Sequence, residues 1–535
     1  MVLATVPRLL GAVDRNPYRA TYGCFDREFW HYRTSAFASE MYQEAVYPLA
    51  LVYNRQLPGN RWYGEPRLRE LAIAGMRFAA RNSHSDASCD DYYPYERALG
   101  AAVFSLVAAA SAYCELQLDD DELRAWLTRR AHWVAEHGES GRLANHHALA
   151  AWGIAQTAAI TGSLELADAA EARVRQVLYW QSAEGWFEEY GGADPGYQTV
   201  TIDALAKYRR HSGARWLDEP LRRAVAFARH FAHPDGSYGG EYGSRGTYHY
   251  YPHGFELLAH DDAAAAALAD GWLGAIERGH AAVPGDDRLY AHPLASFIEA
   301  YCDWAPRRIV EGEPPACAQV SVLSDAGFVV VRAADEHTVV SAARGGVVKH
   351  FASDGAPRSD AGLIVELTDG RVCVSQQHDR SRHWNWRPTA DGGGELTVSG
   401  MLEPARFETA TPLKQAVLHL GMVSVGRWCR TLVRRLLQQR LITGRKAVPI
   451  EFSRRMRFLP QGDKAYRVAI VDQIRLTQAG VQVRRMSYGT DHQSVYTAAT
   501  GVYQSAVLEP WTDLGEHVDA LNAERQVTIE REWPA

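Results

Sequence analysis

The chain has 535 residues, of which 47% are apolar and 23% are charged, a composition typical of a folded globular protein with a large core. The length is consistent with roughly two to four domains. The formal net charge of -7 argues against a protein that binds nucleic acid through a general excess of positive charge. Seven widely spaced cysteines without a CxxC pair predict reduced, buried thiols rather than a disulfide framework or a zinc cluster.

Residues 1–311 are predicted to form a helical domain. Apolar residues recur at the i, i+3, i+4 and i+7 spacing of amphipathic helices, and most joints are short and polar or rich in glycine. Short joints indicate antiparallel neighbouring helices. The clearest segments are 67–81, 96–116, 120–136, 144–161, 163–181, 199–211, 219–232, 263–278 and 293–304, with weaker ones at 37–53 and 255–260.

Two stretches of this domain resemble each other. Residues 184–205 and 235–258 both begin with an acidic residue and glycine, pass through an aromatic residue and Glu-Tyr-Gly, and end in an apolar helix. A repeat of helix pairs with long aromatic loops on one side indicates an α/α toroid, either incomplete or built of six hairpins. The loops of such a ring would gather over a central cleft.

The composition changes at residues 312–319, GEPPACAQ, which we interpret as a linker. Short β-branched runs separated by turns follow, among them 327–332, 338–342, 363–367 and 467–471. This spacing predicts a C-terminal antiparallel β-sandwich over residues 312–535.

One segment of the second domain departs from the strand pattern. Residues 412–442 are predicted to be helical, and residues 427–457 carry ten lysines and arginines against one acid, Glu451. Such a stretch can contact an anionic membrane or an anionic glycan. The alternative is a solvated helix face that packs on the sandwich.

The first residues contain no clean signal peptide, because Arg8 and Arg15 interrupt a short apolar stretch. No window approaches the roughly 18 apolar residues of a membrane-spanning helix. We therefore expect a cytoplasmic protein. The basic stretch makes a peripheral location at the inner membrane the alternative.

Four stretches resemble the heparinase II/III-like polysaccharide lyases: 90–110, DDYYPYERALGAAVFSLVAAA; 143–155, LANHHALAAWGIA; the EGWFEEYGGADPGYQ loop; and the strand pair at 359–372, SDAGLIVELTDGRV. The resemblance in motif order covers most of the chain. It implies an α/α toroid, a β-sandwich and cleavage of an acidic, uronic-acid-containing glycan, without a cofactor or metal. It implies nothing about the oligomeric state.

β-Elimination at a uronate requires donors that hold the carboxyl group, a base at C5 and an acid at the leaving oxygen on C4. The resemblance makes Asn145 the carboxylate binder and His146 a base or supporting donor, with His147 beside them. The alternative for Asn145 is that it simply caps the helix that follows.

Tyr197 follows in the position of the family's catalytic tyrosine, so the resemblance gives it proton transfer. Tyr190 is the rival in the same loop, and each can be a packing residue instead. The second repeat adds further candidates for binding the substrate: Glu241, Arg245, Tyr248 and His249. Arg245 can pair with a carboxylate or sulfate, and Tyr248 or His249 can act as a second acid or base.

Three further features complete the predicted site. The family often places a histidine from the β-domain at the cleft, and His350 is the candidate, although a surface histidine is the alternative. Tyr93, Glu96 and Arg97 are predicted to line the rim and bind sugar hydroxyls, unless the acids near them serve only as helix caps. His249 and His253 have the i, i+4 spacing of metal ligands, but no third ligand accompanies them.

Two other functions are compatible with the same scaffold. A glycoside hydrolase would need two carboxylates across the scissile bond, which Glu188, Glu189, Asp235 and Glu241 can supply. A non-catalytic protein that binds glycans or assists polysaccharide assembly would suit the missing signal peptide and the basic stretch.

Overall fold

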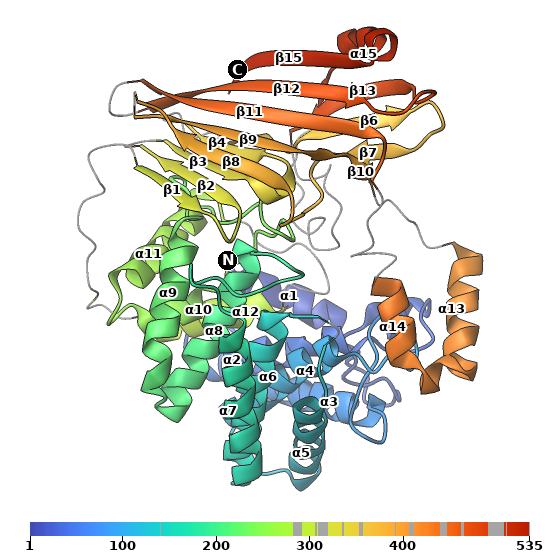
Figure 1. The fold of residues 1–535 in the computed structure, drawn as a ribbon. Coiled ribbons are helices and arrows are strands. Elements are labelled where there is room, and N and C mark those ends of the chain that lie inside the picture. The colour runs from blue at the N-terminus through green and yellow to red at the C-terminus, as the bar shows by residue number, and fades with distance from the viewer. Residues whose placement is uncertain are drawn as a thin grey trace.

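The computed structural model describes residues 1–139, 141–281, 291–304, 308, 319–333, 336–352, 357–390, 392–405, 411–438, 447–461, 465–490, 508–509 and 511–533. Helices make up the first part of the chain and antiparallel sheets the second, with the sheets layered over one end of the helices (Figure 1). The predicted order of a helical domain followed by a β-domain is therefore confirmed. The linker at 312–319 lies outside the described residues except for Gln319.

The helical domain contains α1 (Val2–Ala12), α2 (Val46–Asn54), α3 (Pro66–Asn82), α4 (Leu99–Glu115), α5 (Asp121–Glu136), α6 (Ala144–Thr161), α7 (Leu164–Tyr179), α8 (Pro195–Ser212), α9 (Asp218–Arg229), α10 (Pro252–Leu258), α11 (Ala263–Arg278) and α12 (Ala291–Cys302). Even-numbered helices α2 to α12 contact one another in chain order, and α12 returns to contact α2. The odd-numbered helices pack outside them, so the described hairpins close into a ring.

Inner and outer helices differ in sequence, because apolar residues cover most of the surface of an inner helix and only one face of an outer helix. On α4 and α6 nearly every position is buried, as expected of helices that are apolar all round and packed on every side. On α9 the buried residues Leu221, Ala224, Val225 and Ala228 follow the i, i+3, i+4 and i+7 pattern, and the opposite face is charged.

The two similar stretches adopt the same turn at equivalent positions. Gly185 and Gly236 both have a positive φ, and a Cβ at either would lie within 2.6 Å of a backbone oxygen of the next outer helix. Only glycine allows this backbone conformation together with so close an approach. The repeat therefore positions two loops, residues 182–194 before α8 and 233–251 before α10, on the same side of the ring.

The described residues of the β-domain form three five-stranded antiparallel sheets. The first sheet is β1 (Gln319–Leu323), β2 (Phe328–Arg332), β3 (His337–Ser341), β4 (Val347–Phe351) and β5 (Pro357–Asp360). The second sheet is ordered β10 (Glu403–Pro404), β7 (Val372–Val374), β6 (Leu363–Leu367), β13 (Val483–Gly489) and β14 (Trp511–Asp513). The third is ordered β15 (Gln526–Trp533), β12 (Ala465–Leu476), β11 (Ile450–Gln461), β9 (Gly394–Met401) and β8 (His383–Pro388). A short helix, α15 (Val518–Glu524), precedes β15.

The three central strands of the first sheet, β2 to β4, are buried on both faces. Side chains of successive strand residues point to opposite faces, so Val329, Val340 and Val348 pack against the third sheet. Phe328 and Val339 point the other way and belong to the hydrophobic core of the helical domain. This continuous core fixes the β-domain against the ends of the ring.

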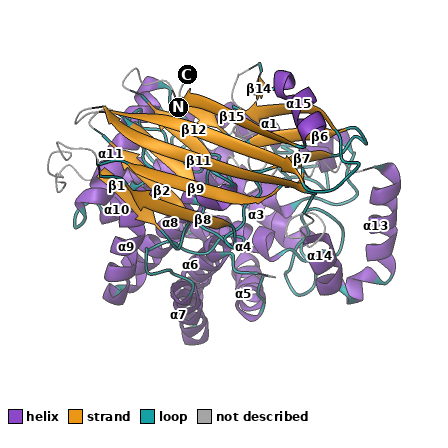
Figure 2. Ribbon diagram, turned by 45° about the horizontal axis from the view of Figure 1, so that its top comes forward, coloured by secondary structure: helices purple, strands orange, loops and turns teal. Residues whose placement is uncertain are grey.

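The segment predicted as one helix at 412–442 forms two. α13 (Pro412–Ser424) and α14 (Arg430–Gln438) are separated by a 3-10 turn, Gly426–Trp428, and residues 439–442 lie outside the described part. The break follows a run of weak helix formers, in which Gly421 and Gly426 alternate with valines and Ser424. Both helices stand beside the ring, apart from the sheets (Figure 2).

The basic stretch at 427–457 is not one continuous surface. Arg454 lies on β11 and is fully buried, with its guanidinium paired to Asp472 at 2.7 Å and to Asp360 at 3.1 Å. Its charge is therefore compensated inside the sandwich and faces neither lipid nor glycan. Arg455 and Arg457 point outward from the same strand because side chains alternate along it.

In the described part of the chain, no helix is both long and apolar enough to span a membrane. The six cysteines in that part are free thiols, and Cys317 lies outside it.

Candidate active site

The candidate site lies where the loops before α8 and α10 meet the start of α6. The two loops are joined directly, since Ser244 donates its hydroxyl to the carbonyl of Glu189 at 2.9 Å and its N–H to Ala193 at 2.9 Å. The β-domain closes over the second loop, because Arg344 donates to the carbonyl of Gly243 at 2.5 Å. The repeat and the domain interface thus build one polar cluster.

Asn145 lies in the first turn of α6 and is buried. The N-cap residue of the helix is Leu143, whose side chain makes no capping hydrogen bond, and Asn145 lies inside the first turn, so the capping role considered for Asn145 is not what the structure shows. Its side-chain Oδ1 is buried without a hydrogen-bond partner among the described residues. A buried amide oxygen without a hydrogen-bond donor is rare in folded proteins, and a bound ligand or water that donates to it is one explanation.

Glu189, in the loop before α8, hydrogen-bonds the backbone at the start of α6. One carboxylate oxygen accepts the backbone N–H of Asn145 at 2.7 Å, and the other has no partner in the described structure. Burial raises the pKa of Glu189 to about 8, and hydrogen bonding from Asn145 only partly opposes this. Glu189 is therefore mostly protonated at neutral pH and can donate a hydrogen bond to an anion.

Arg245 brings a positive charge into the same cluster. Its guanidinium lies over the ring of Tyr190 at 3.9 Å, and its backbone N–H donates to Asp194 at 2.8 Å. Tyr190 has a positive φ, which for a non-glycine residue is a strained conformation held by its surroundings. Asp194 also caps α8 through the N–H of Tyr197 at 3.1 Å, so one carboxylate ties Arg245 to the start of α8.

Tyr197 and His249 meet at this point, with ring centroids 5.0 Å apart. Burial raises the pKa of Tyr197, and the charge of Arg245 acts in the opposite direction. Burial lowers the pKa of His249 to about 4, and the charges of His292 and Arg245 add to this effect. At neutral pH the pair therefore consists of a protonated phenol and an uncharged imidazole.

His146 points to the rim of the cluster. Its Nδ1 lies 3.2 Å from Glu139, which also pairs with Arg434 of α14. Burial works to raise the pKa of Glu139, but the hydrogen bond from His146 and the charge of Arg434 outweigh it and lower the pKa to about 2. Sequence reasoning missed Glu139 and its link to α14, because nothing in the local pattern connects residues so far apart.

Tyr93 and Glu96 lie at the same rim and are buried. Burial, together with the nearby charge of Asp91, raises the pKa of Glu96 to about 7, while Arg434 opposes the shift. Arg97 turns away and forms an ion pair with Asp86. Two of the three predicted rim residues are thus brought to the cluster.

Glu241 and Tyr248 face the β-domain. The Tyr248 hydroxyl donates to Glu241 at 2.5 Å, and Lys349 of β4 lies 3.2 Å from the same carboxylate and 3.0 Å from the Tyr248 oxygen. Sequence reasoning selected His350, the next residue on this strand. Alternation places His350 in the sandwich instead, where it bonds Thr338 at 2.8 Å and packs on Trp533.

Other predicted residues are engaged elsewhere. His147 points toward α7, where it accepts from Arg173 at 2.8 Å. His253 lies 2.7 Å from Asp303 rather than beside His249. No group of three or more potential metal ligands occurs in the described part of the chain.

The carboxylates considered for hydrolysis are dispersed in the same way. Glu188 pairs with Arg142 at 3.0 Å, and Asp235 holds its own turn through the N–H of Ser237 at 2.9 Å. Glu241 is held by Lys349 and Tyr248, as described above. Among the described residues, Glu189 is the only one of these four with a buried carboxylate oxygen that lacks a hydrogen-bond partner.

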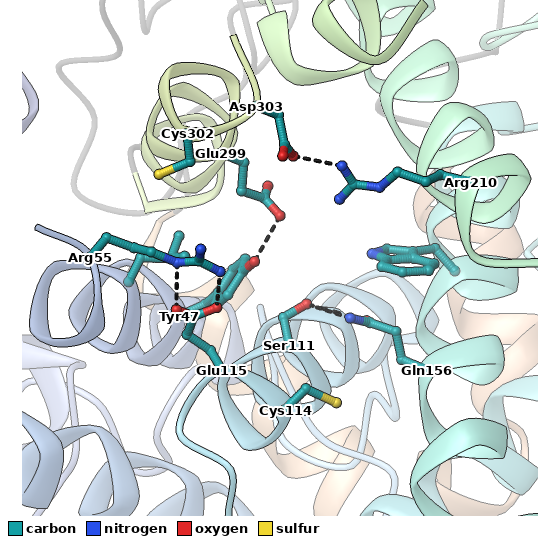
Figure 3. Close-up of a pocket in the computed structure, with 12 residues that line it drawn as sticks. Tyr47, Arg55, Ser111, Cys114, Glu115, Gln156, Arg210, Glu299, Cys302 and Asp303 are labelled. Carbon is teal, nitrogen blue, oxygen red and sulfur yellow. Dashed lines mark hydrogen bonds and ion pairs between the residues drawn. The ribbon is translucent and has the colours of Figure 1, made fainter. Parts of the chain in front are cut away.

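A cavity of about 260 Å³ opens at the end of the ring opposite the candidate site, where the inner helices end (Figure 3). Arg55 pairs there with Glu115 at 2.7 Å, and Arg210 pairs with Asp303 at 2.7 Å. Because both guanidinium groups are paired with carboxylates, this cavity has no uncompensated positive charge from them to attract an acidic glycan.

No protein-family model and no curated protein matches the sequence. Among solved structures, a mutant of chondroitin AC lyase from Streptomyces coelicolor A3 matches with a TM-score of 0.47 at 11% identity, covering 99% of this chain and 76% of the lyase. The same lyase in complex with chondroitin sulphate gives 0.45 at 13% identity, covering 99% and 79%. Heparinase III gives 0.49 at 10% identity, covering 84% of this chain and 65% of that enzyme. These similarities extend over most of the chain, at identities of 10–13% and TM-scores below 0.5.

Proposed function

We propose that this protein is a polysaccharide lyase that cleaves a uronic-acid-containing glycan by β-elimination. The observation that carries the proposal is the neutral pair Asn145–Glu189, buried beside Tyr197, His249 and Arg245. Hydrogen bonds from an amide and a protonated carboxyl group would bind the uronate carboxylate and stabilise the charge that develops on it. This stabilisation makes the C5 proton acidic enough to remove.

The protonation states of Tyr197 and His249 support one arrangement of the two proton transfers. Uncharged His249 accepts the proton as the C5–H bond breaks, and protonated Tyr197 donates a proton to the oxygen that leaves C4. The C4–O bond breaks as the C4–C5 double bond forms, so the electrons balance without an oxidant. Arg245 is close enough to both rings to stabilise the phenolate that Tyr197 becomes.

The test follows the ultraviolet absorbance of the unsaturated uronate product during incubation with uronic-acid glycans that differ in hexuronate and sulfation. We expect wild type to produce the chromophore from at least one glycan. Asn145→Ala and Tyr197→Phe should each lower the rate by about 10²- to 10⁴-fold. Tyr208→Phe, a buried tyrosine near the other end of α8, is the matched control and should retain the wild-type rate.

The other functions would give different results. New reducing ends without a chromophore would identify a hydrolase. Glycan binding without any cleavage would identify a binding protein, and either result overturns the proposal.

A further inference from the structure

Residues 411–438, which we call the arm, leave the sandwich between β10 and β11 and expose an unusual amount of apolar surface. On α13, Leu413 is 74% exposed and Leu420 is 68% exposed, and Val417 between them is also exposed. Trp428 at the turn is 73% exposed, and Leu432 and Leu436 on α14 continue the surface. Apolar side chains of this size and number normally mark a binding surface.

The charges of the arm have a single sign. Residues 411–438 contain Lys414, Arg427, Arg430, Arg434 and Arg435, and no aspartate or glutamate. The Arg427 guanidinium lies over the Trp428 ring at 4.2 Å, so a cation and the exposed indole are presented together. Amphipathic helices that lie in the membrane interface have this composition: they are rich in leucine, tryptophan and arginine and poor in acidic residues.

We propose that the arm docks this protein onto an anionic lipid surface. The leucines, Val417 and Trp428 would enter the boundary between headgroups and acyl chains, and Arg427 and Arg430 would bind lipid phosphates. A second copy of the chain fits this face less well, because a twofold interface brings identical patches together and would oppose arginine to arginine. An anionic membrane supplies both the apolar layer and the negative charge that the arm lacks.

The arm is also attached to the candidate active site. Arg434 of α14 pairs with Glu139, and Glu139 accepts from His146 at the rim. A membrane bound to the outer side of the arm would therefore lie next to the rim of the site. This position suits a glycan held at a membrane surface, although docking itself does not depend on the proposed activity.

The experiment is cosedimentation of the full-length protein with vesicles of phosphatidylcholine, with or without phosphatidylglycerol. We expect binding to the vesicles that contain phosphatidylglycerol, weaker binding to phosphatidylcholine alone, and release at high salt. The variants Leu420→Glu/Trp428→Glu and Arg427→Glu/Arg430→Glu should each weaken binding by about tenfold or more.

Matched controls separate the arm from general surface effects. Leu164→Glu changes an apolar side chain that is 81% exposed on α7, and Arg129→Glu/Arg387→Glu reverses two exposed charges outside the arm. Both should bind vesicles as wild type does. Circular dichroism checks that every variant is folded.

Three outcomes would overturn the proposal. The first is a wild-type protein that stays in the supernatant with every vesicle. The second is an equal loss of binding in the arm and control variants. The third is a dimer in sedimentation velocity that the arm variants dissociate while vesicle binding is unchanged. Cleavage of a free glycan is measured separately, so loss of docking and loss of activity can be told apart.

Discussion

Glu189 shows how burial alone changes what a carboxyl group can do. Its folded-state pKa of about 8 lies above the ordinary value of 4.5, so the folded protein holds a proton that the unfolded chain has already released. The contribution of Glu189 to stability must then fall as the pH rises from about 4.5 to 8, because at this site the folded state binds more protons across that range.

Glu189→Gln keeps an oxygen that can accept the Asn145 N–H but cannot ionise. We expect the melting temperature of wild type to decline relative to the variant between about pH 5 and 8, the range over which only the unfolded chain has released the proton of Glu189. Differential scanning calorimetry at a series of pH values measures the difference. Parallel curves for the two proteins would mean that Glu189 is ionised in the folded state.

At the scale of single residues, the sequence indicates which kinds of side chain form the candidate site better than it indicates which way each side chain points. Asn145, Tyr197 and His249 were predicted from their motifs, and the structure gathers them around the same two loops, while their roles stay a prediction. Lys349 was missed in favour of His350, since a strand exposes opposite faces at neighbouring positions and the sequence does not say which face meets the ring. Glu139 was missed because its partners come from helices far apart in the chain.

At the scale of elements, α8 and the second loop pack so closely that a side chain at their junction would clash. Gly196 lies in the first turn of α8, and a Cβ there would lie 2.2 Å from the Thr247 hydroxyl and 2.9 Å from the backbone nitrogen of His249. Any larger residue must push this loop away from α8, together with the hydrogen bond that Thr247 donates to Asp194.

We therefore expect Gly196→Ala to destabilise the protein by about 1–3 kcal/mol and to displace His249 from Tyr197. Chemical denaturation and the lyase assay measure the two effects. Gly11→Ala is the control, because a Cβ at Gly11 would meet nothing within 4 Å. Wild-type stability and activity in Gly196→Ala would show that the loop adapts without cost.

The elements themselves were largely predictable, because their signals are local. Helical periodicity located the ring helices, and the repeat located both loops on one side. The break between α13 and α14 was missed, since weak helix formers lower helix stability without fixing where a helix stops. The division of strands among three sheets was not predicted either, because strand partners such as β6 and β13 are more than a hundred residues apart.

At the scale of the whole molecule, the two domains share both an apolar core and a buried ion pair. Lys349 of β4 and Glu241 of the second loop meet where neither is exposed to water. Burial works to raise the pKa of Glu241, but the charge of Lys349 and the hydrogen bond from Ser359 outweigh it and lower the pKa. The pair therefore stabilises the interface above the unfolded-state pKa of about 4.5. That contribution is lost as the pH falls through the folded-state pKa.

Removing only the charge of Lys349 should destabilise the protein more than removing the charges of both Lys349 and Glu241. Lys349→Met leaves Glu241 buried with hydroxyl donors alone, which we expect to cost about 3–5 kcal/mol in the free energy of unfolding. Lys349→Met/Glu241→Gln contains no uncompensated charge and should recover most of that loss. Arg129→Met, at an exposed position, should leave stability unchanged. Chemical denaturation at neutral pH compares the four proteins, and a double variant no more stable than Lys349→Met would show that the charge pair is not what joins the β-domain to the ring.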